Sequence, residues 1–167
     1  MENELLFLGL LKGGPKHGYE IKRLIKEEIN TFFKVDSTSI YYPLRQLERQ
    51  GLIKKSTTQA GKRPEKYVYS LTPRGEVRFK RLLQDSLIRI ERPFFSIDLG
   101  LYFISYLSPR LAKRRLNTRL NLLRRLKGQL LDLIKTTKPK PSNLINILRH
   151  NLKLLESEIE SLLEFLS

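Results

Sequence analysis

Side chains able to contact a polyanion stand close together in one short segment of the N-terminal half. They are Thr38, Ser39, Tyr41, Tyr42 and Arg45. Hydroxyl groups and phenols bond to phosphates or base edges, and arginine grips guanine through two hydrogen bonds in the major groove of DNA. The segment therefore has the residue types of a DNA-reading helix. A solvated helix surface is the alternative for Arg45, and the protein core is the alternative for Tyr41.

Two further groups of side chains suit contacts to phosphates. The first surrounds a polar turn and consists of Lys54, Lys62, Arg63 and Lys66. Its alternative is a hairpin tip that only solubilises the protein. The second stands at the start of a predicted helix, where free amides attract anions, and consists of His17, Tyr19 and Lys22. A surface histidine with no task is the alternative for His17.

The overall charge also predicts a polyanionic partner. The 167 residues include 32 Lys and Arg against 17 Asp and Glu, which gives a net charge of +15. Nucleic acid attracts such a chain. No membrane span is expected, because the most apolar stretch, residues 94–107, is short and interrupted by Asp98. The N-terminal residues lack a signal-peptide pattern and the chain has no cysteine, so we expect a cytoplasmic location.

The residues that enzymes use for catalysis are missing or wrongly spaced. Gly9 and Gly14 have the spacing of a phosphate-binding loop, but Pro15 and Lys16 follow where Lys and Ser or Thr are required. The sequence has no Gly-x-Ser-x-Gly motif and only two histidines, one in each half. We therefore predict no enzyme, no metal site and no cofactor.

Apolar spacing predicts three helices, a hairpin and a fourth helix in the first half. Helices are expected at residues 3–11 and 17–29, and a third begins within 36–39 and ends at Gly51. Strands at 52–57 and 66–71 enclose the polar turn. Thr72 then caps a helix whose first residue is Pro73. The third helix is expected to turn its apolar residues, Ile40, Leu44 and Leu47, into the core.

This order of elements is that of a winged helix-turn-helix, whose third helix enters the major groove. The predicted fold class is mainly α with a small β-hairpin. Residues 1–90 are expected to form the winged helix-turn-helix DNA-binding domain. Residues 91–167 are expected to form an antiparallel helical domain for dimerisation and effector binding.

A regular apolar seam marks the last predicted helix. Its members alternate spacings of three and four residues and are Ile145, Leu148, Leu152, Leu155, Ile159, Leu162 and Leu166. Such a seam is stable only when it is buried against another helix, and we expect that helix in a second copy of the chain. The alternative partner is the helix predicted within residues 110–135 of the same chain.

Two other features of the second half have alternative interpretations. Five aromatic residues are candidates for an effector pocket or for a plain core between the domains: Phe94, Phe95, Tyr102, Phe103 and Tyr106. Residues 108–140 hold eleven basic groups against Asp132 alone. A solvated face is the default for this basic stretch. The alternatives are DNA binding and pairing with Glu156, Glu158, Glu160 or Glu164.

A set of motifs in the first half is typical of one known family. They are Phe7-Leu8-Gly9-Leu10-Leu11, His17-Gly18-Tyr19-Glu20-Ile21, Ser39-Ile40-Tyr41 with Leu44 and Leu47-Glu48, Gly51-Leu52-Ile53, and Gly61 with Tyr69 through Gly75. In these motifs the sequence resembles the PadR family of bacterial transcriptional regulators. Residues 102–108 also resemble the opening of the family's helical C-terminal domain. Members commonly place proline directly after the tyrosine of the recognition helix, whereas here Tyr42 intervenes before Pro43.

The resemblance implies a homodimeric repressor that binds a pseudo-palindromic double-stranded DNA operator. In that family the C-terminal helices pair the subunits, and a small effector, often aromatic or drug-like, releases the DNA. A non-specific basic nucleic-acid-binding or architectural protein is the alternative. RNA binding is disfavoured, because Tyr67 and Tyr69 lie in a hairpin too small for a stacking platform.

Overall fold

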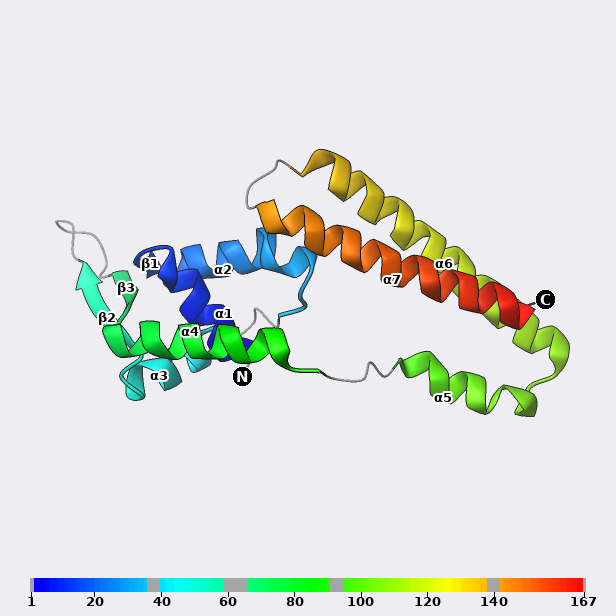
Figure 1. The fold of residues 1–167 in the computed structure, drawn as a ribbon, viewed down its shortest axis with the longest axis horizontal. Coiled ribbons are helices and arrows are strands. Elements are labelled where there is room, and N and C mark those ends of the chain that lie inside the picture. Colours follow the sequence, from blue (N-terminus) through cyan, green and yellow to red (C-terminus); the bar gives the residue numbers. More distant parts are fainter. Residues whose placement is uncertain (1, 36–39, 59–65, 91–94, 138–141, 167) are drawn as a thin grey trace. The chain divides into compact units, whose positions relative to one another are not determined.

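The structure is a computed structural model that describes residues 2–35, 40–58, 66–90, 95–137 and 142–166 (Figure 1). The chain divides into two compact units, Met1–Glu91 and Arg92–Ser167. The described part of the first unit combines helices with a small sheet, whereas the described part of the second is helical.

The predicted order of helices, hairpin and helix in the first unit is confirmed. Its elements are α1 (Glu2–Lys12), β1 (Lys16–His17), α2 (Gly18–Glu27), the 3-10 helix η1 (Ile29–Thr31), α3 (Tyr41–Arg49), β2 (Ile53–Thr58), β3 (Lys66–Leu71) and α4 (Pro73–Ile88). The prediction of one helix over residues 17–29 is wrong at both ends. Residues 16 and 17 pair with β3 as a strand, and the chain continues after α2 as η1. The sheet is antiparallel with the order β1-β3-β2.

The apolar faces of the helices meet in one core. The predicted core residues of α3, Ile40, Leu44 and Leu47, are buried, which confirms the periodicity. Ile21 and Ile25 of α2 are fully buried against them. Each such side chain stabilises the fold by roughly 1.5–3 kcal/mol when it leaves water. The opposite face of α3 is thereby held toward solvent.

Hydrogen bonds among Gly51, Leu52 and Thr72 join the end of α3 to the hairpin and to α4. Gly51 has a positive φ of 70°, and its amide donates to Glu48 while the Leu52 amide donates to Leu47, which closes α3 in a Schellman motif. Thr72 caps α4 by accepting a hydrogen bond from the Gly75 amide at 3.0 Å, as predicted. The junction fixes where the recognition helix stops and the wing begins.

The second unit is built on a pair of long helices. It contains α5 (Ser96–Tyr102), the 3-10 helix η3 (Ile104–Tyr106), α6 (Pro109–Thr136) and α7 (Ser142–Leu166), and α6 and α7 lie side by side in Figure 1. Leu116 and Leu123 of α6 bury Leu162 of α7, and Ile97 and Leu101 of α5 pack onto this cluster. α6 has Ser108 as its N-cap and Pro109 as its first residue, and it contains the helix predicted within residues 110–135.

Among the described residues, no helix has the length and apolar character needed to cross a membrane.

Candidate nucleic-acid interface

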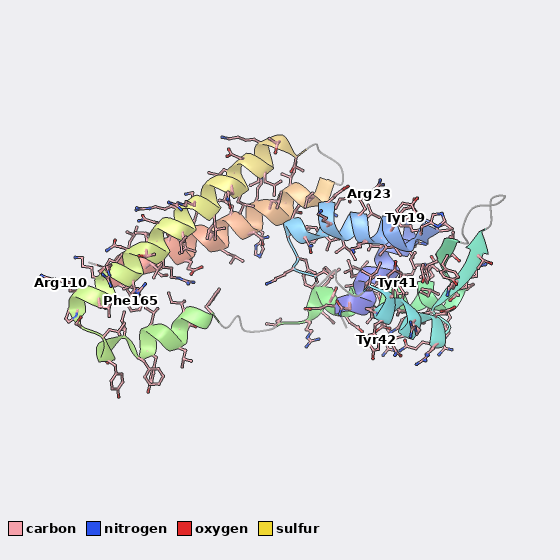
Figure 2. All side chains as sticks on the ribbon, turned by 180° about the vertical axis from the view of Figure 1, so that it is seen from behind. Tyr19, Arg23, Tyr41, Tyr42, Arg110 and Phe165 are labelled. Atoms are coloured by element: carbon pink, nitrogen blue, oxygen red, sulfur yellow. The ribbon has the colours of Figure 1, made fainter. Side chains whose placement is uncertain are left out.

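The outer face of α3 carries the side chains predicted to read DNA. Tyr41 and Tyr42 lie on this face (Figure 2), where they are 56 % and 65 % exposed. Arg45 is exposed one turn after Tyr41. Leu44 and Leu47 occupy the opposite, buried face. The core alternative for Tyr41 is therefore wrong, because its ring lies largely in solvent. The helix presents two phenols and the Arg45 guanidinium on its polar surface.

Proline is tolerated at the start of α3 because of its position in the first turn. Pro43 is the third residue of the helix, where a backbone amide has no intrahelical partner to lose. The backbone hydrogen bond at the start of the helix runs from the Leu44 amide to the Ile40 carbonyl oxygen, at 3.3 Å. Thr38 and Ser39 lie outside the described residues.

The start of α2 is held against the sheet by His17. The His17 Nδ1 lies 3.2 Å from the Tyr67 carbonyl oxygen, and its ring stacks on Tyr19 with centroids 5.4 Å apart. The His17 amide donates to the Glu20 carboxylate at 2.6 Å. Glu20 thus already occupies one amide at this positively polarised end of α2. Lys22 is exposed on the next turn.

The N-terminal ends of α2 and α3 are in direct contact. A Cβ placed on Gly18 would lie 3.1 Å from Cε1 of Tyr41, so the ring of Tyr41 rests on the bare backbone of α2. His17 ties the same end of α2 to β3. Three segments that are distant in the sequence, around residues 17–19, 41–45 and 67, therefore form one surface.

Charges on α3 act on a tyrosine beneath this surface. Burial raises the pKa of Tyr69, the charges of Glu48, Tyr41 and Tyr67 raise it further, and Arg45 acts in the opposite direction. Tyr69 stays neutral near pH 7, and its ring closes the core under the interface.

The sheet contributes cations beside α3. Lys54 and Lys55 of β2 are exposed, and Lys55 Nζ lies 3.5 Å from the ring centroid of Tyr67, a cation–π contact. Lys54 is the freer of the two for a phosphate. Lys62 and Arg63 lie outside the described residues. Lys66 is the first residue of β3, and its side chain is also outside the described part.

Sequence reasoning missed two parts of this surface. The strand β1 has only two residues, too few for an alternation pattern, and it brings Lys16 opposite Tyr69. Arg49 is exposed in the last turn of α3, four residues after Arg45. That spacing was a usable signal, because residues four apart share a helix face.

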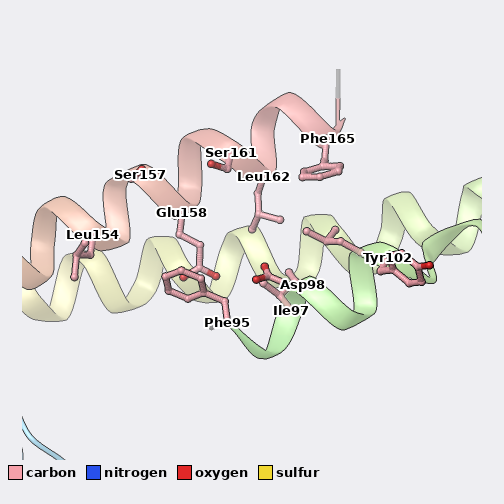
Figure 3. Close-up of a pocket in the computed structure, with 11 residues that line it drawn as sticks. Phe95, Ile97, Asp98, Tyr102, Leu154, Ser157, Glu158, Ser161, Leu162 and Phe165 are labelled. Carbon is pink, nitrogen blue, oxygen red and sulfur yellow. The ribbon is translucent and has the colours of Figure 1, made fainter. Parts of the chain in front are cut away.

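The predicted effector residues do not all belong to one cavity. A cavity of about 590 Å³ lies between α5 and α7 and is lined by Phe95 and Tyr102 (Figure 3). Phe103 and Tyr106 are exposed and do not line this cavity. Tyr106 is the last residue of η3, and Phe103 directly precedes this helix. Phe94 lies outside the described residues. The other wall comes from α7, which the sequence did not assign to a pocket.

Part of the seam of α7 is used within the chain. Leu148 and Leu162 are buried, and Leu155, Ile159 and Leu166 pack onto the cluster shared with α6. Ile145 and Leu152 are half-buried. The intramolecular alternative therefore holds for the residues of that cluster. The apolar side chains that α7 leaves exposed lie off the seam and are Leu154, Leu163 and Phe165.

The basic stretch of α6 combines two of its predicted interpretations. Arg119 donates to Glu158 of α7 through Nε at 3.2 Å, and Lys127 pairs with Glu156 at 2.7 Å. The other cations of this stretch that the structure describes are exposed and are Arg110, Lys113, Arg114, Arg115, Arg124, Arg125 and Lys135, of which Lys135 lies 3.9 Å from Asp132. Two cations of α6 therefore pair with carboxylates of α7, and the exposed cations form a solvated face.

Comparison with known proteins gives consistent matches. The model of the "Transcriptional regulator PadR-like family" matches residues 7–81. The negative transcriptional regulator PadR of Bacillus subtilis (strain 168) is 35% identical over 140 residues, which are 79% of this chain and 75% of that protein. The crystal structure of Bacillus subtilis PadR in complex with operator DNA superposes with a TM-score of 0.75 at 27% identity, over 98% of this chain and 95% of that one. The structure of Bacillus subtilis PadR in complex with p-coumaric acid has a TM-score of 0.73 at 24% identity, over 98% and 92% of the two chains.

Proposed function

This chain belongs to the PadR-like family of transcriptional regulators, and from that membership we propose that it is a repressor that binds one operator as a homodimer. The observation that carries the proposal is the surface on which α3 exposes Tyr41, Tyr42 and Arg45 beside the start of α2 and the sheet. Such a surface offers base-reading groups and phosphate-binding groups together. The similar Bacillus subtilis PadR has been crystallised with operator DNA.

In this proposal α3 lies in the major groove, and Arg45 contacts a guanine. Lys54 and the start of α2 bind phosphates on either side of the groove, together with the turn residues Lys62 and Arg63. Two copies of α3 about one helical turn of DNA apart would read the two halves of a pseudo-palindrome. An operator of this kind implies a cytoplasmic location.

We propose that a small molecule bound between α5 and α7 controls release of the operator. The cavity volume of about 590 Å³ falls within the usual range for small-molecule sites. The relative from Bacillus subtilis has been crystallised with p-coumaric acid, which is a small aromatic compound. The second copy of the chain would meet Leu163, an exposed apolar side chain of α7 that does not line the cavity.

A titration of the protein against a duplex from its own upstream region tests this function. A scrambled duplex of equal length is the control, and both are measured at two salt concentrations. We expect saturation of the upstream duplex at two chains per site. Equal, steeply salt-dependent binding to both duplexes would instead support the architectural alternative.

The variant Arg45→Ala tests base reading within the same assay. We expect it to weaken operator binding by about 1–3 kcal/mol and to relax the preference at one base position. Arg81→Ala is the matched control, since Arg81 is an exposed arginine on α4 whose Nε lies 3.9 Å from the Asp85 carboxylate. Uniform weakening on every duplex would refute the base-reading role of Arg45.

A further inference from the structure

The cavity between α5 and α7 has aromatic and aliphatic walls. Phe95 and Tyr102 stand on the α5 side, and Leu154, Leu162 and Phe165 project from α7 (Figure 3). All of its lining residues belong to the second unit. Walls of this kind accept the apolar body of a small molecule.

The polar groups of the cavity are acidic or neutral. Asp98 and Glu158 contribute carboxylates, and Ser157 and Ser161 contribute hydroxyls. Among the lining residues that the structure describes, none is Lys, Arg or His. This is unusual in a chain with a net charge of +15. The cavity is a locally acidic site in a basic protein.

The two carboxylates differ in their partners. Glu158 accepts hydrogen bonds from the Arg119 guanidinium of α6, including one from Nε at 3.2 Å, so its charge is already balanced. Asp98, in the first turn of α5, has no ion pair within the described part of the chain. The uncompensated charge of the cavity is therefore the carboxylate of Asp98.

We infer that this cavity binds a small molecule with a positively charged nitrogen on an aromatic or aliphatic body. The cation would pair with Asp98 and lie against the π-faces of Phe95, Tyr102 or Phe165, which attract cations. A carboxylate ligand would meet two carboxylates and no cation from the lining. The cavity therefore discriminates against anions such as p-coumarate. Action of the bound cation on the operator rests on the function proposed above, whereas its binding does not.

Calorimetry on the full chain without DNA tests the inference with three probes of one carbon skeleton. The probes are phenylpropylamine, phenylpropanol and phenylpropanoate, with p-coumarate as a fourth. We expect the amine to bind about three- to fivefold more tightly than the alcohol, as for a solvent-accessible ion pair, and the two carboxylates to bind more weakly than both.

Matched variants test whether Asp98 causes the preference for the amine. Asp98→Asn should reduce the affinity for the amine to that for the alcohol, and leave the alcohol unchanged. Asp132→Asn is the control, because Asp132 is an exposed carboxylate on α6 that does not line the cavity. Ser161→Trp, which fills the cavity, should abolish binding of all the probes.

Several results would overturn the inference. They are tighter binding of phenylpropanoate or p-coumarate, an amine preference that survives Asp98→Asn, and binding unaffected by Ser161→Trp. Absence of binding by every probe would also overturn it, and light scattering of Phe165→Ala would then show whether a second copy of the chain occupies the groove. Operator titration of the same preparations separates a failure of the cation site from a failure of DNA binding.

Discussion

Removal of one hydroxyl group should loosen the connection between the recognition helix and the wing. The Thr72 Oγ1 accepts a hydrogen bond from the Gly75 amide at 3.0 Å. The same hydroxyl is 2.8 Å from the Gly51 carbonyl oxygen and 3.0 Å from that of Leu52, and it donates its proton to this pair. Thr72→Ala removes both the helix cap and the donor, at the point where α3, β2 and α4 meet.

The expected cost follows from these two contacts. Loss of an N-cap hydroxyl costs about 1 kcal/mol, within a range of 0.5–2. Loss of a hydrogen bond to a half-buried carbonyl costs about 1 kcal/mol more. We therefore expect Thr72→Ala to lower the free energy of unfolding by about 2 kcal/mol. Thr72→Ser keeps both hydrogen bonds and should cost about 0.5 kcal/mol or less.

Urea unfolding of the full chain measures the difference between the two variants. A loss of 2 kcal/mol moves the midpoint of the first unit's transition by about 1 M, for a slope near 2 kcal/mol per molar. Operator affinity at low temperature should stay unchanged, because the hydroxyl does not lie on the outer face of α3. If the Ala and Ser variants unfold at the same urea concentration, the hydroxyl does not hold this junction and the reasoning is wrong.

Three further predictions concern packing, pH and salt. Gly75→Ala should cost more than about 4 kcal/mol in urea unfolding, because a Cβ there would lie 1.9 Å from the Leu52 carbonyl oxygen; a loss below 1 kcal/mol would contradict this close approach. The hydrogen bonds from Arg78 lower the pKa of Glu4 in the folded protein. The pair therefore stabilises the fold fully when the pH is above the pKa of the carboxyl group in the unfolded chain. This stabilisation is lost as the pH falls through the lower pKa that Glu4 has in the folded protein. Glu4→Gln should therefore cost about 0.5–1 kcal/mol at pH 7, and the difference from wild type should vanish in acid; a constant difference would refute the linkage. Lys62→Ala should lower the slope of log affinity against log salt by about one unit with little change in specificity, and an unchanged slope would show that Lys62 contacts no phosphate.

The elements that the sequence predicted correctly have patterns confined to a few neighbouring residues. The spacing of Ile40, Leu44 and Leu47 encodes one buried face of α3, and Thr72-Pro73 encodes the start of α4. Each signal depends on residues within about four positions, so it survives without knowledge of the rest of the fold.

The elements that were missed depend on partners far along the chain. β1 forms because β3 leaves one edge open for pairing with Lys16 and His17, and a two-residue segment has no pattern of its own. The seam of α7 showed which side chains are apolar, but not that Leu162 would pack against α6 of the same chain. An apolar stripe is equally well buried by any complementary helix, so its pattern does not name the partner.

The sequence by itself determined the longer helices and the hairpin of β2 and β3, the basic charge and the polar side chains that α3 exposes. Only the tertiary structure decided that the ends of α2 and α3 touch through Gly18 and Tyr41, and that an acidic cavity opens between α5 and α7. The physical reason is that local periodicity is set by neighbours along the chain. The meeting of distant surfaces depends instead on shape and burial across the whole unit.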